Sequence, residues 1–588
     1  FKMCKFCSGE YKNPLNRRYH AQPVSCPNCG PRLALKDKFG RVLARDNESA
    51  KQAARLINEG KILAVKGLGG FHLMCRLKED TIGLLRERKK RPKKPFAVMC
   101  KDLARAKKYA QISPEEQRLL SSNLKPIVVL QSLPGVPVPS NLAPGLNKIG
   151  IFLPYTGVHL LLFEYLDGDV IATSANVSGE PIIYGEKDLR EKLGCVIDFY
   201  LDNDREIHSP SDDSIAFVAD NEPIFIRTSR GVHPKFIRTK FKSEKTVLAV
   251  GAELKNQFAI FKDGELMISP YIGDLKNVAT YERFCALINL FSEIYELKFD
   301  EIVADLHPHF LNLKWAREYA ANFGSNITQI QHHHAHLLSV ILENDLDAKR
   351  EYLGFCFDGT GYGADGSVWG GEIMKVRGKE YERVCKFDEI LLIGGEASVK
   401  NIRQIAYAAI LKYDLEREAE AFLAKFEPAK LKNLKILHEK QINCVKTSSL
   451  GRIFDAFAAV ILGLDSISYE GEAGMSLEAL YDANLDVCYE FEISSDKICF
   501  KEAFKRALKD DAKTAATGFI KGLAKLVADV ACAQPNDVLL AGGVFQNKAL
   551  LENVILILKQ KGKKYYINKN FSSNDSSVAI GQIALTLI

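Results

Sequence analysis

The sequence lacks the features that place a chain in a membrane or mark it, by charge alone, as a nucleic-acid binder. No apolar run approaches the roughly 20 residues that a membrane-spanning helix needs. The net charge is only +7 over 588 residues, which does not by itself imply a nucleic-acid partner. No signal-like segment precedes the first cysteine pair. We therefore expect a cytoplasmic protein with no membrane contact and no nucleic-acid partner.

The composition is also unremarkable in its balance of residue types. Hydrophobic residues make up 47% and charged residues 26% of the chain, as in ordinary globular proteins. A chain of 588 residues is too long for one core, so about two to four domains are expected. The chain opens on Phe1 and reaches a cysteine pair at once, which we interpret as a fragment whose native start is missing.

Ten of the 14 cysteines show no framework spacing, and this scatter favours a reducing cytosol. The other four form two C-x2-C pairs with eighteen residues between them, namely Cys4, Cys7, Cys26 and Cys29. Such pairs let four thiolates close a tetrahedron around zinc, and a closed site of this kind is structural. A segment this short needs such a staple to fold. Four unrelated cysteines would not account for the spacing, so residues 1–35 are predicted to form a zinc finger.

The next predicted region, residues 45–235, carries a run of seven cations between residues 86 and 94. The run follows a buried strand at 61–66 and a glycine-rich turn at 67–72, where a ligand could touch backbone. A charge run is usually a solvated face or a nucleic-acid patch. Here Pro92 and Pro95 fix the backbone, and the apolar strand 96–99 anchors the cations beside a core. These features favour phosphate binding.

A polar turn with Ser174 and Asn176 follows the strand that starts at Ile171. Such residues suit any turn, but they also suit the phosphate or ribose of a nucleotide. Lys89-x-Arg91, Ser174-x-Asn176 and residues 226–231 together resemble the YrdC-like family. That family binds ATP in a basic cavity and forms acyl-adenylates of the carbamoyl type. The resemblance implies catalytic roles for Lys89 and Arg91, and ATP binding by Lys66, Ser174, Asn176, Arg227, Ser229 and Arg230.

Four of the 12 histidines lie between residues 332 and 336. In a helix, His332 and His336 share one face at a spacing of about 6 Å and can share a metal, whereas His333 and His334 point elsewhere. The alternative is a polar helix start whose histidines only meet solvent. Asp358, at the end of an apolar strand, and Asp575, in a strand-to-helix turn, favour the metal site. Such mixed ligands admit zinc, iron or manganese.

The third region, residues 243–588, follows a basic segment at 234–245 that we interpret as a linker. A strand, a glycine turn and a hairpin at 247–269 have a counterpart at 352–374. This weak internal duplication predicts a two-lobed fold of the actin/sugar-kinase kind, although two unrelated hairpins would give the same pattern. Glycines before a helix suit phosphate or an ordinary tight turn. The candidate nucleotide-binding residues here are Gly359, Thr360, Gly361, Gly363, Gly542, Gly543 and Asn547.

The order of these pieces resembles the HypF family of hydrogenase maturation carbamoyltransferases over nearly all of the chain. The markers are the Cys4–Cys29 finger with residues 10–11 and 17–23, the YrdC-like pieces, the histidine run, and residues 357–363 and 542–547. The resemblance implies a multidomain α/β fold. Its parts are a zinc finger, a YrdC-like ATP-binding domain and a two-lobed carbamoyltransferase domain related to tRNA threonylcarbamoyl transferases and TobZ.

The same resemblance implies three chemical steps. An acylphosphatase-like domain converts carbamoyl phosphate to carbamate, and the YrdC-like domain joins carbamate to ATP, releasing pyrophosphate. The last domain passes the carbamoyl group to the C-terminal cysteine of HypE for cyanide ligand synthesis. Lys89 and Arg91 would offset phosphate charge. The implied cofactors are ATP with magnesium, zinc in the finger, and zinc or iron held by His332, His336, Asp358 and Asp575 as a Lewis acid.

Three departures from the family pattern bear on these expectations. The chain lacks the acylphosphatase-like domain and the first of two zinc fingers, so we expect poor use of carbamoyl phosphate. Residues 574–577 read Asn-Asp-Ser-Ser in place of Asn-Asp-Gly-Gly, which keeps the metal-binding Asp575 but changes the backbone that a ligand would approach. Lys400 and Gln404 stand where arginines are expected.

A tRNA-modifying or RNA-binding protein is the main alternative. A zinc finger, a basic run and relatives that act on tRNA all suit it. The weak global charge argues against it, because nucleic-acid affinity depends on many cation contacts. A scaffold without catalysis would leave the histidine and aspartate set without a purpose.

Overall fold

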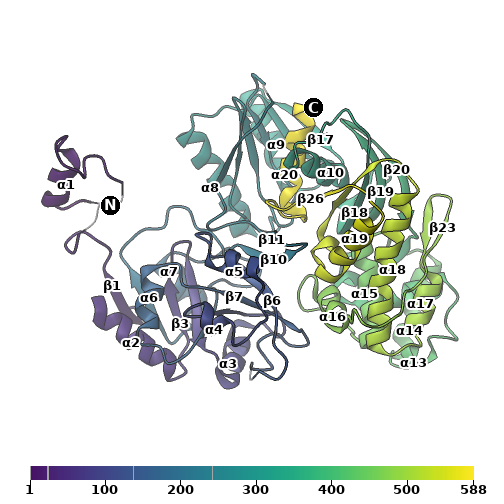
Figure 1. Cartoon of the computed structure of the whole chain (residues 1–588), viewed down its shortest axis with the longest axis horizontal. Coiled ribbons are helices and arrows are strands. Elements are labelled where there is room, and N and C mark those ends of the chain that lie inside the picture. The colour runs from purple at the N-terminus through teal and green to yellow at the C-terminus, as the bar shows by residue number, and fades with distance from the viewer. Residues whose placement is uncertain (1, 23–25, 137, 242) are drawn as a thin grey trace.

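The computed structural model describes residues 2–22, 26–136, 138–241 and 243–588. These residues form three β-sheets, one in the YrdC-like region and one in each lobe of the C-terminal region. In Figure 1 the small N-terminal segment stands to one side, the YrdC-like domain lies below, and the two lobes lie above and to the right. The predicted multidomain α/β organisation is confirmed.

The YrdC-like domain is built on an 11-stranded sheet with apolar clusters on both faces. The N-terminal segment before it contains α1 (Lys5–Lys12). The strands are β1 (Leu33–Asp37), β2 (Val42–Arg45), β3 (Leu63–Lys66), β4 (Phe71–Arg76), β5 (Ala97–Met99), β6 (Ile127–Gln131), β7 (Lys148–Phe152), β8 (Val170–Ser174), β9 (Phe199–Asn203), β10 (Ile215–Ala219) and β11 (Glu222–Arg227). The helices are α2 (Asp46–Asn58), α3 (Glu79–Lys89), α4 (Leu103–Ala106), α5 (Pro114–Ser121), α6 (Gly157–Phe163) and α7 (Glu186–Leu193).

The first lobe of the C-terminal region has a six-stranded sheet. Its strands are β12 (Lys235–Arg238), β13 (Val247–Ala249), β14 (Ala259–Lys262), β15 (Glu265–Ile268), β16 (Glu301–Asp305) and β17 (Asn326–Ile330). Its helices are α8 (Val278–Ile294), α9 (Leu311–Phe323), α10 (His332–Glu343) and the C-terminal α20 (Val578–Leu587). The linker interpretation of 234–245 is wrong in part, because β12 pairs with β15 and extends this sheet. Lys235 and Arg238 give it the charged character of an edge strand.

The second lobe has a nine-stranded sheet. Its strands are β18 (Tyr352–Tyr362), β19 (Val368–Arg377), β20 (Glu380–Phe387), β21 (Ile390–Ile393), β22 (Cys444–Thr447), β23 (Glu492–Ser494), β24 (Lys497–Cys499), β25 (Asp537–Ala541) and β26 (Tyr565–Ile567). Its helices are α11 (Glu396–Lys400), α12 (Ile402–Lys412), α13 (Glu420–Leu423), α14 (Pro428–Glu439), α15 (Leu450–Leu462), α16 (Glu472–Leu480), α17 (Lys501–Ala507), α18 (Ala512–Cys532) and α19 (Lys548–Gln560), with two 3-10 turns, η1 (Gly543–Gln546) and η2 (Asp575–Ser577).

The two lobes repeat one strand plan, which confirms the internal duplication predicted from the sequence. In the first lobe, the antiparallel strands β15, β14 and β13 are followed by the parallel strands β16 and β17. In the second, the antiparallel strands β20, β19 and β18 are followed by the parallel strands β25 and β26. Helix α20 returns from the second lobe to pack beside α10 in the first (Figure 1).

The glycine turn predicted at 359–363 is not a turn. Strand β18 continues through Tyr362, with a register shift between Phe357 and Gly361 where it pairs with β19. A bulge of this kind bends a strand and re-aims its side chains. The described helices include none long and apolar enough to cross a membrane.

Candidate functional site

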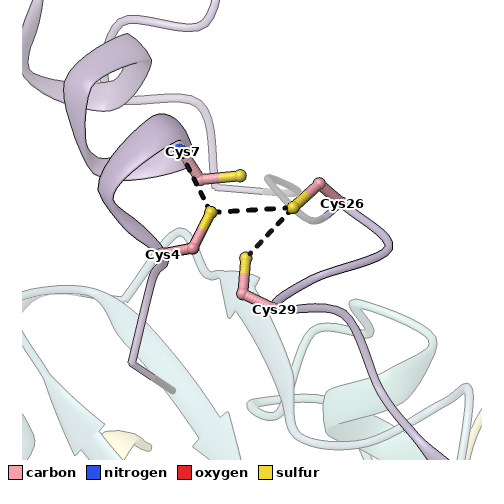
Figure 2. Close-up of side chains that lie close together, drawn as sticks. All are labelled: Cys4, Cys7, Cys26 and Cys29. Carbon is pink, nitrogen blue, oxygen red and sulfur yellow. Dashed lines mark hydrogen bonds between the residues drawn. The ribbon is translucent and has the colours of Figure 1, made fainter.

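The four cysteines predicted to bind zinc lie together near the start of the chain (Figure 2). The sulfur of Cys26 is 3.7 Å from that of Cys4 and 3.7 Å from that of Cys29. None of the four forms a disulfide. Backbone hydrogen bonds lower the pKa of Cys29 to about 6, which favours the thiolate that metals bind.

Lys89, the last residue of α3, reaches the polar turn after β8. Its ammonium donates to the carbonyls of Ser174 and Asn176 at 2.9 and 2.8 Å, and to Oδ1 of Asn176 at 2.9 Å. Burial, followed by the charges of Arg91 and Lys94, lowers the pKa of Lys89 to about 7. A polyanion bound here would restore the charge on this amine.

Arg91 lies beside the same turn. Its guanidinium donates to Thr173 Oγ1 at 3.4 Å, hydrogen-bonds to the carbonyl of Pro95, and lies 4.7 Å from the ring centre of Phe96. Burial lowers the pKa of Arg91 to about 10. The structure therefore brings together the predicted pairs Lys89-x-Arg91 and Ser174-x-Asn176.

Two of the seven cations make contacts within the protein that stabilise the fold. Arg86 donates to the carbonyls of residues 91, 92, 94, 141 and 142, and so fixes the loop that carries Arg91. Arg88 pairs with Asp198 at 3.0 Å. The prediction of one phosphate site from the whole run was therefore too broad, because these two side chains of α3 are already paired with protein atoms.

The other predicted ATP-binding residues of this domain also contact protein atoms. Lys66 pairs with Asp202 at 3.2 Å. Arg227 donates to the carbonyl of Asp213 at 2.8 Å, and Ser229 shares a 2.8 Å hydrogen bond with Ser211. The guanidinium of Arg230 bonds to Asp213 and to the carbonyls of residues 124 and 125.

The histidine run forms the first turns of α10. The Gln331 side chain caps this helix by accepting a hydrogen bond from the backbone N–H of His334 at 2.9 Å. Residues 332–341 are all buried, so the helix lies inside the lobe rather than on its surface. The solvent-facing alternative for these histidines is therefore wrong.

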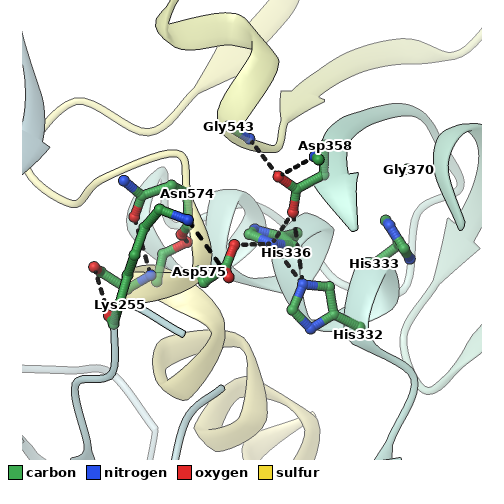
Figure 3. Close-up of polar contacts among 12 residues, drawn as sticks. Lys255, His332, His333, His336, Asp358, Gly370, Gly543, Asn574 and Asp575 are labelled. Atoms are coloured by element: carbon green, nitrogen blue, oxygen red, sulfur yellow. Dashed lines mark hydrogen bonds and ion pairs between the residues drawn. The ribbon is translucent and has the colours of Figure 1, made fainter. Parts of the chain in front are cut away.

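His332, His336, Asp358 and Asp575 converge in the interior (Figure 3), with one ligand atom from each lying within 4.8 Å of the others. Nε2 of His336 is 3.2 Å from Nε2 of His332, 3.2 Å from Asp358 Oδ2 and 3.9 Å from Asp575 Oδ1. Two imidazoles and two carboxylates at this spacing could hold one divalent metal.

The protein groups around this cluster do not by themselves keep its histidines neutral and both of its carboxylates ionised. Burial opposes the charged form of His332, but Asp305 and Asp358 outweigh it and raise its pKa well above the ordinary value. Burial raises the pKa of Asp575 to about 7, with Asp358 acting in the same direction and Lys255 against it. A divalent cation would let both carboxylates ionise.

Two residues that contact this cluster were not predicted from the sequence. Asp305, the last residue of β16, accepts a 2.7 Å hydrogen bond from Nδ1 of His332, and a carboxylate in this position fixes the tautomer of a metal-binding histidine. Lys255 lies 2.6 Å from Glu470 and 3.8 Å from Asp575. An apolar strand ending in Asp was the available signal for Asp305, whereas nothing in the pattern marked Lys255. Ser576, one of the departures, donates to the Lys255 carbonyl at 2.9 Å.

The predicted glycines support Asp358. Its Oδ1 accepts hydrogen bonds from the backbone N–H groups of Gly359 at 2.8 Å and Gly543 at 3.2 Å. A side chain on Gly361 would collide with His333, and one on Gly542, whose φ is +96°, would meet the Phe357 carbonyl. Thr360 and Gly363 lie on the same strand and at its end. Asn547 caps α19 by accepting from the N–H of Leu550 at 3.0 Å.

The two candidate sites meet at the end of β11. The Ile226 carbonyl accepts hydrogen bonds from Ser572 at 2.9 Å and from Asn574 at 3.0 Å. Ile226 precedes Arg227 of the predicted ATP site, and Asn574 precedes Asp575 of the histidine–aspartate cluster. The Arg227 guanidinium lies 5.5 Å from the ring centre of Tyr271, which belongs to the first lobe.

Four family models match successive parts of the chain. The HypF finger matches residues 3–36, and the telomere recombination family, which covers Sua5, YciO and YrdC proteins, matches residues 55–229. The HypF Kae1-like domain matches residues 242–343, and the second subdomain of the carbamoyltransferase Kae1-like domain matches residues 354–582. The expectation that a first finger is missing finds no support here, since the HypF finger itself is matched at residues 3–36.

Relatives match almost the whole chain. The carbamoyltransferase HypF of Synechocystis sp. is 34% identical, covering 99% of this chain and 85% of its own length. That of Rhodobacter capsulatus is 34% identical over 99% of this chain and 78% of its own. A crystal structure of full-length HypF in the phosphate- and nucleotide-bound form is similar with a TM-score of 0.92 and 34% identity, covering 100% of this chain and 78% of that one.

Proposed function

The chain belongs to the HypF carbamoyltransferase family, and we propose that it makes carbamoyl-adenylate in its YrdC-like domain and transfers the carbamoyl group in its two-lobed domain. The first step joins a carbamate oxygen to the α-phosphorus of ATP and breaks the bond to the bridging oxygen, so that pyrophosphate leaves. Lys89 and Arg91, beside Ser174 and Asn176, offset the charge that these polyanions bring together.

The second step is attack of a protein thiolate on the carbamoyl carbon, with AMP as the leaving group. His332, His336, Asp358 and Asp575 would hold a divalent metal, which when bound supplies Lewis-acid chemistry toward the adenylate phosphate. The residues fit such an ion. Asp358 Oδ2 is buried, and its contacts among the described residues are the ion pairs to Nε2 of His336 at 3.2 Å and of His332 at 3.6 Å rather than a well-formed hydrogen bond. The two imidazole Nε2 atoms face each other at 3.2 Å.

One observation supports this proposal, namely that the loop of Asp575 hydrogen-bonds to the strand end next to Arg227, a residue proposed to bind ATP. The Ile226 carbonyl links the strand of the predicted ATP site to the loop of Asp575. Adenylates of this kind hydrolyse readily in water, so adjacent enclosed sites limit their loss. The finer parts of the proposal are carbamoyl phosphate as carbamate source, HypE as acceptor in nickel–iron hydrogenase maturation, and zinc held by the four cysteines as a structural ion.

The deciding experiment measures AMP and pyrophosphate release with each acyl donor, and then carbamoylation of the HypE thiol by mass spectrometry. We expect carbamate to drive AMP formation, carbamoyl phosphate to be used poorly, and the thiol to gain a carbamoyl group. Threonine with bicarbonate and tRNA is the matched control for the alternative function. AMP formation that requires threonine, or a carbamoylated tRNA with an unmodified thiol, would contradict the proposal.

A further inference from the structure

A cluster of polar groups, most of them buried, lies beneath the glycine turn between β3 and β4, and only its Arg230 is among the residues predicted above to bind ATP. It consists of His72, Tyr155, His159, Asp213 and Arg230. Burial alone would raise the pKa of Asp213, but His72 and Arg230 hold it well below the ordinary range. A buried ionised carboxylate of this kind is costly unless it is fully paired, so the arrangement of its partners is informative.

Asp213 fixes the orientation and the tautomer of His72. The Nε2 of His72 lies 2.8 Å from Asp213 Oδ2, and Arg230 Nε donates to Asp213 Oδ1 at 2.7 Å. An ionised carboxylate only accepts hydrogen bonds, so His72 Nε2 carries the hydrogen of this contact. Arg230 already pairs with the other oxygen of this carboxylate, so Nδ1, the acceptor nitrogen of the Nε2–H tautomer, is the ring nitrogen left for another group.

This acceptor has no partner within the part of the chain that the structure describes. His72 is 3% exposed, and its Nδ1 is buried without a hydrogen bond. A buried aspartate–histidine pair often serves only the fold, but such a role leaves the second ring nitrogen unexplained. A Cβ placed on Gly67 would lie 3.7 Å from His72 Nδ1 and 3.6 Å from the hydroxyl of Tyr155. Both polar atoms therefore lie within reach of the same side of the glycine turn.

The acceptor lies next to the proposed adenylation site. His72 on β4 stands directly opposite Ser174 on β8, so the two side chains share one face of the sheet. Ser174 Oγ hydrogen-bonds to Asn176 Oδ1 at 3.1 Å, and Lys89 donates to the same oxygen. His72 is thus one strand away from the groups that would bind phosphate.

We infer that His72, held by Asp213, positions the acyl substrate by accepting a hydrogen bond from its amino group. The inference rests on the proposed function and adds a specificity residue to it. Carbamate carries N–H donors that match the Nδ1 acceptor. A substrate with an ionised oxygen in place of the amino group would be repelled by Nδ1. Gly67 keeps the space between the turn and His72 free of a side chain.

The test uses the full chain with carbamate generated from ammonium and bicarbonate, and measures KM for carbamate and for ATP separately through pyrophosphate release. His72→Gln places its amide nitrogen near the position of Nε2, which preserves the contact with Asp213 but removes the acceptor at Nδ1. We expect KM for carbamate to rise about tenfold or more, as when a buried polar contact is left unmade, with KM for ATP within about twofold.

Gly67→Ala provides an independent variant that leaves the Asp213 pair intact. Its new methyl meets only ordinary contacts, yet it stands between the turn and His72 and should raise KM for carbamate in the same way. Gly83→Ala in α3, where the nearest atom to the new methyl is 3.7 Å away, is the matched control and should leave both constants unchanged. Wild-type KM for carbamate in both His72→Gln and Gly67→Ala, or a parallel rise in KM for ATP, overturns the inference. Absence of AMP formation by the wild type would instead overturn the proposed function beneath it.

Discussion

Neighbouring histidines on α10 have different partners because of the faces they occupy. His332 and His336 face the carboxylates, whereas His334 Nε2 lies 3.2 Å from the Gly378 carbonyl. Burial lowers the pKa of His334 to about 4. The i, i+4 spacing alone predicted this division, because the helix period sets which side chains share a face.

We predict that loss of either a ligand or its support weakens metal binding without affecting adenylation. His336→Ala should abolish retention of the transferase-domain metal. Asp305→Asn, which frees the His332 ring, should weaken the affinity for this metal by about 10- to 100-fold. Competition with a chelator measures the affinity, and pyrophosphate release should stay within about twofold of wild type. His334→Ala is the control and should retain metal; equal metal loss in all three variants would point to a folding defect instead.

The lowered pKa of Lys89 gives a second prediction at this scale. In the free protein the pKa is about 7, so at pH 8 the amine is mostly neutral. Bound phosphates favour its charged form, and ATP binding at pH 8 should therefore take up protons, whereas at pH 6 the amine is already charged and uptake should be small. Calorimetry in buffers of different ionisation enthalpy measures the number of protons taken up when ATP binds. The Lys89→Met variant should lose the proton uptake that Lys89 contributes. If the uptake in that variant is unchanged, the protons are taken up by Lys94 instead.

Residues set by local pattern were predictable, whereas those set by tertiary contact were not. His332, His336 and the two strand-end carboxylates follow from helix periodicity and from the position of Asp after an apolar strand. Lys255 and His72 come from segments that are distant in sequence and reach their sites only through folding. Arg86 and Arg88 belong to the same charge run as Lys89, but the direction of each side chain along α3 decides which protein atoms it contacts.

Helices α10 and α20 are the elements whose packing sets the geometry of the histidine–aspartate cluster. A Cβ on Gly581 of α20 would lie 1.7 Å from the Ala335 carbonyl oxygen of α10, so the two backbones are in direct contact. His336 follows Ala335, and Asp575 lies in η2 just before α20. Any separation of these helices therefore moves two candidate metal ligands apart.

We predict that Gly581→Ala lowers the stability of the C-terminal domain by about 1–3 kcal/mol or more, the usual cost of overpacking. It should also weaken metal retention, because the His336–Asp575 distance grows. Gly474→Ala in α16, whose nearest new contact is 3.8 Å away, is the matched control and should stabilise by about 0.5–1 kcal/mol or leave stability unchanged. Thermal unfolding with metal analysis distinguishes the two variants; equal melting temperatures would contradict the close packing.

At the element scale the hairpin at 258–269 was predictable, because two short apolar runs flank the turn sequence Lys262-Asp263-Gly264-Glu265. Two elements were misread for physical reasons. The segment 234–245 has the polar composition of a linker, and only its pairing with β15 makes part of it a strand. The glycines of 359–363 signal a turn locally, but pairing with β19 continues the strand through a bulge.

At the scale of the whole molecule, the important feature is that both candidate sites belong to one chain and share the end of β11. The two domains also meet through Thr228, whose hydroxyl donates to Gln257 at 3.1 Å, and through Lys148, which pairs with Glu478 at 2.7 Å. A buried contact across a domain boundary restrains relative motion. If both candidate sites act as proposed, an adenylate made in one domain would pass to the other within a single chain.

This arrangement predicts that the two steps are coupled within one molecule. A Lys89→Met chain should lack adenylation, and a His336→Ala chain should lack transfer, while each keeps the other site intact. If the adenylate passes inside one chain, an equimolar mixture of the two variants should give less than about one tenth of wild-type carbamoylation of the acceptor thiol, since release into water favours hydrolysis. Mass spectrometry of the thiol measures the yield, and pyrophosphate release by the His336→Ala chain confirms that adenylate is being made. Restoration of carbamoylation in the mixture, increasing as both variants are concentrated, would show instead that the adenylate diffuses freely between molecules.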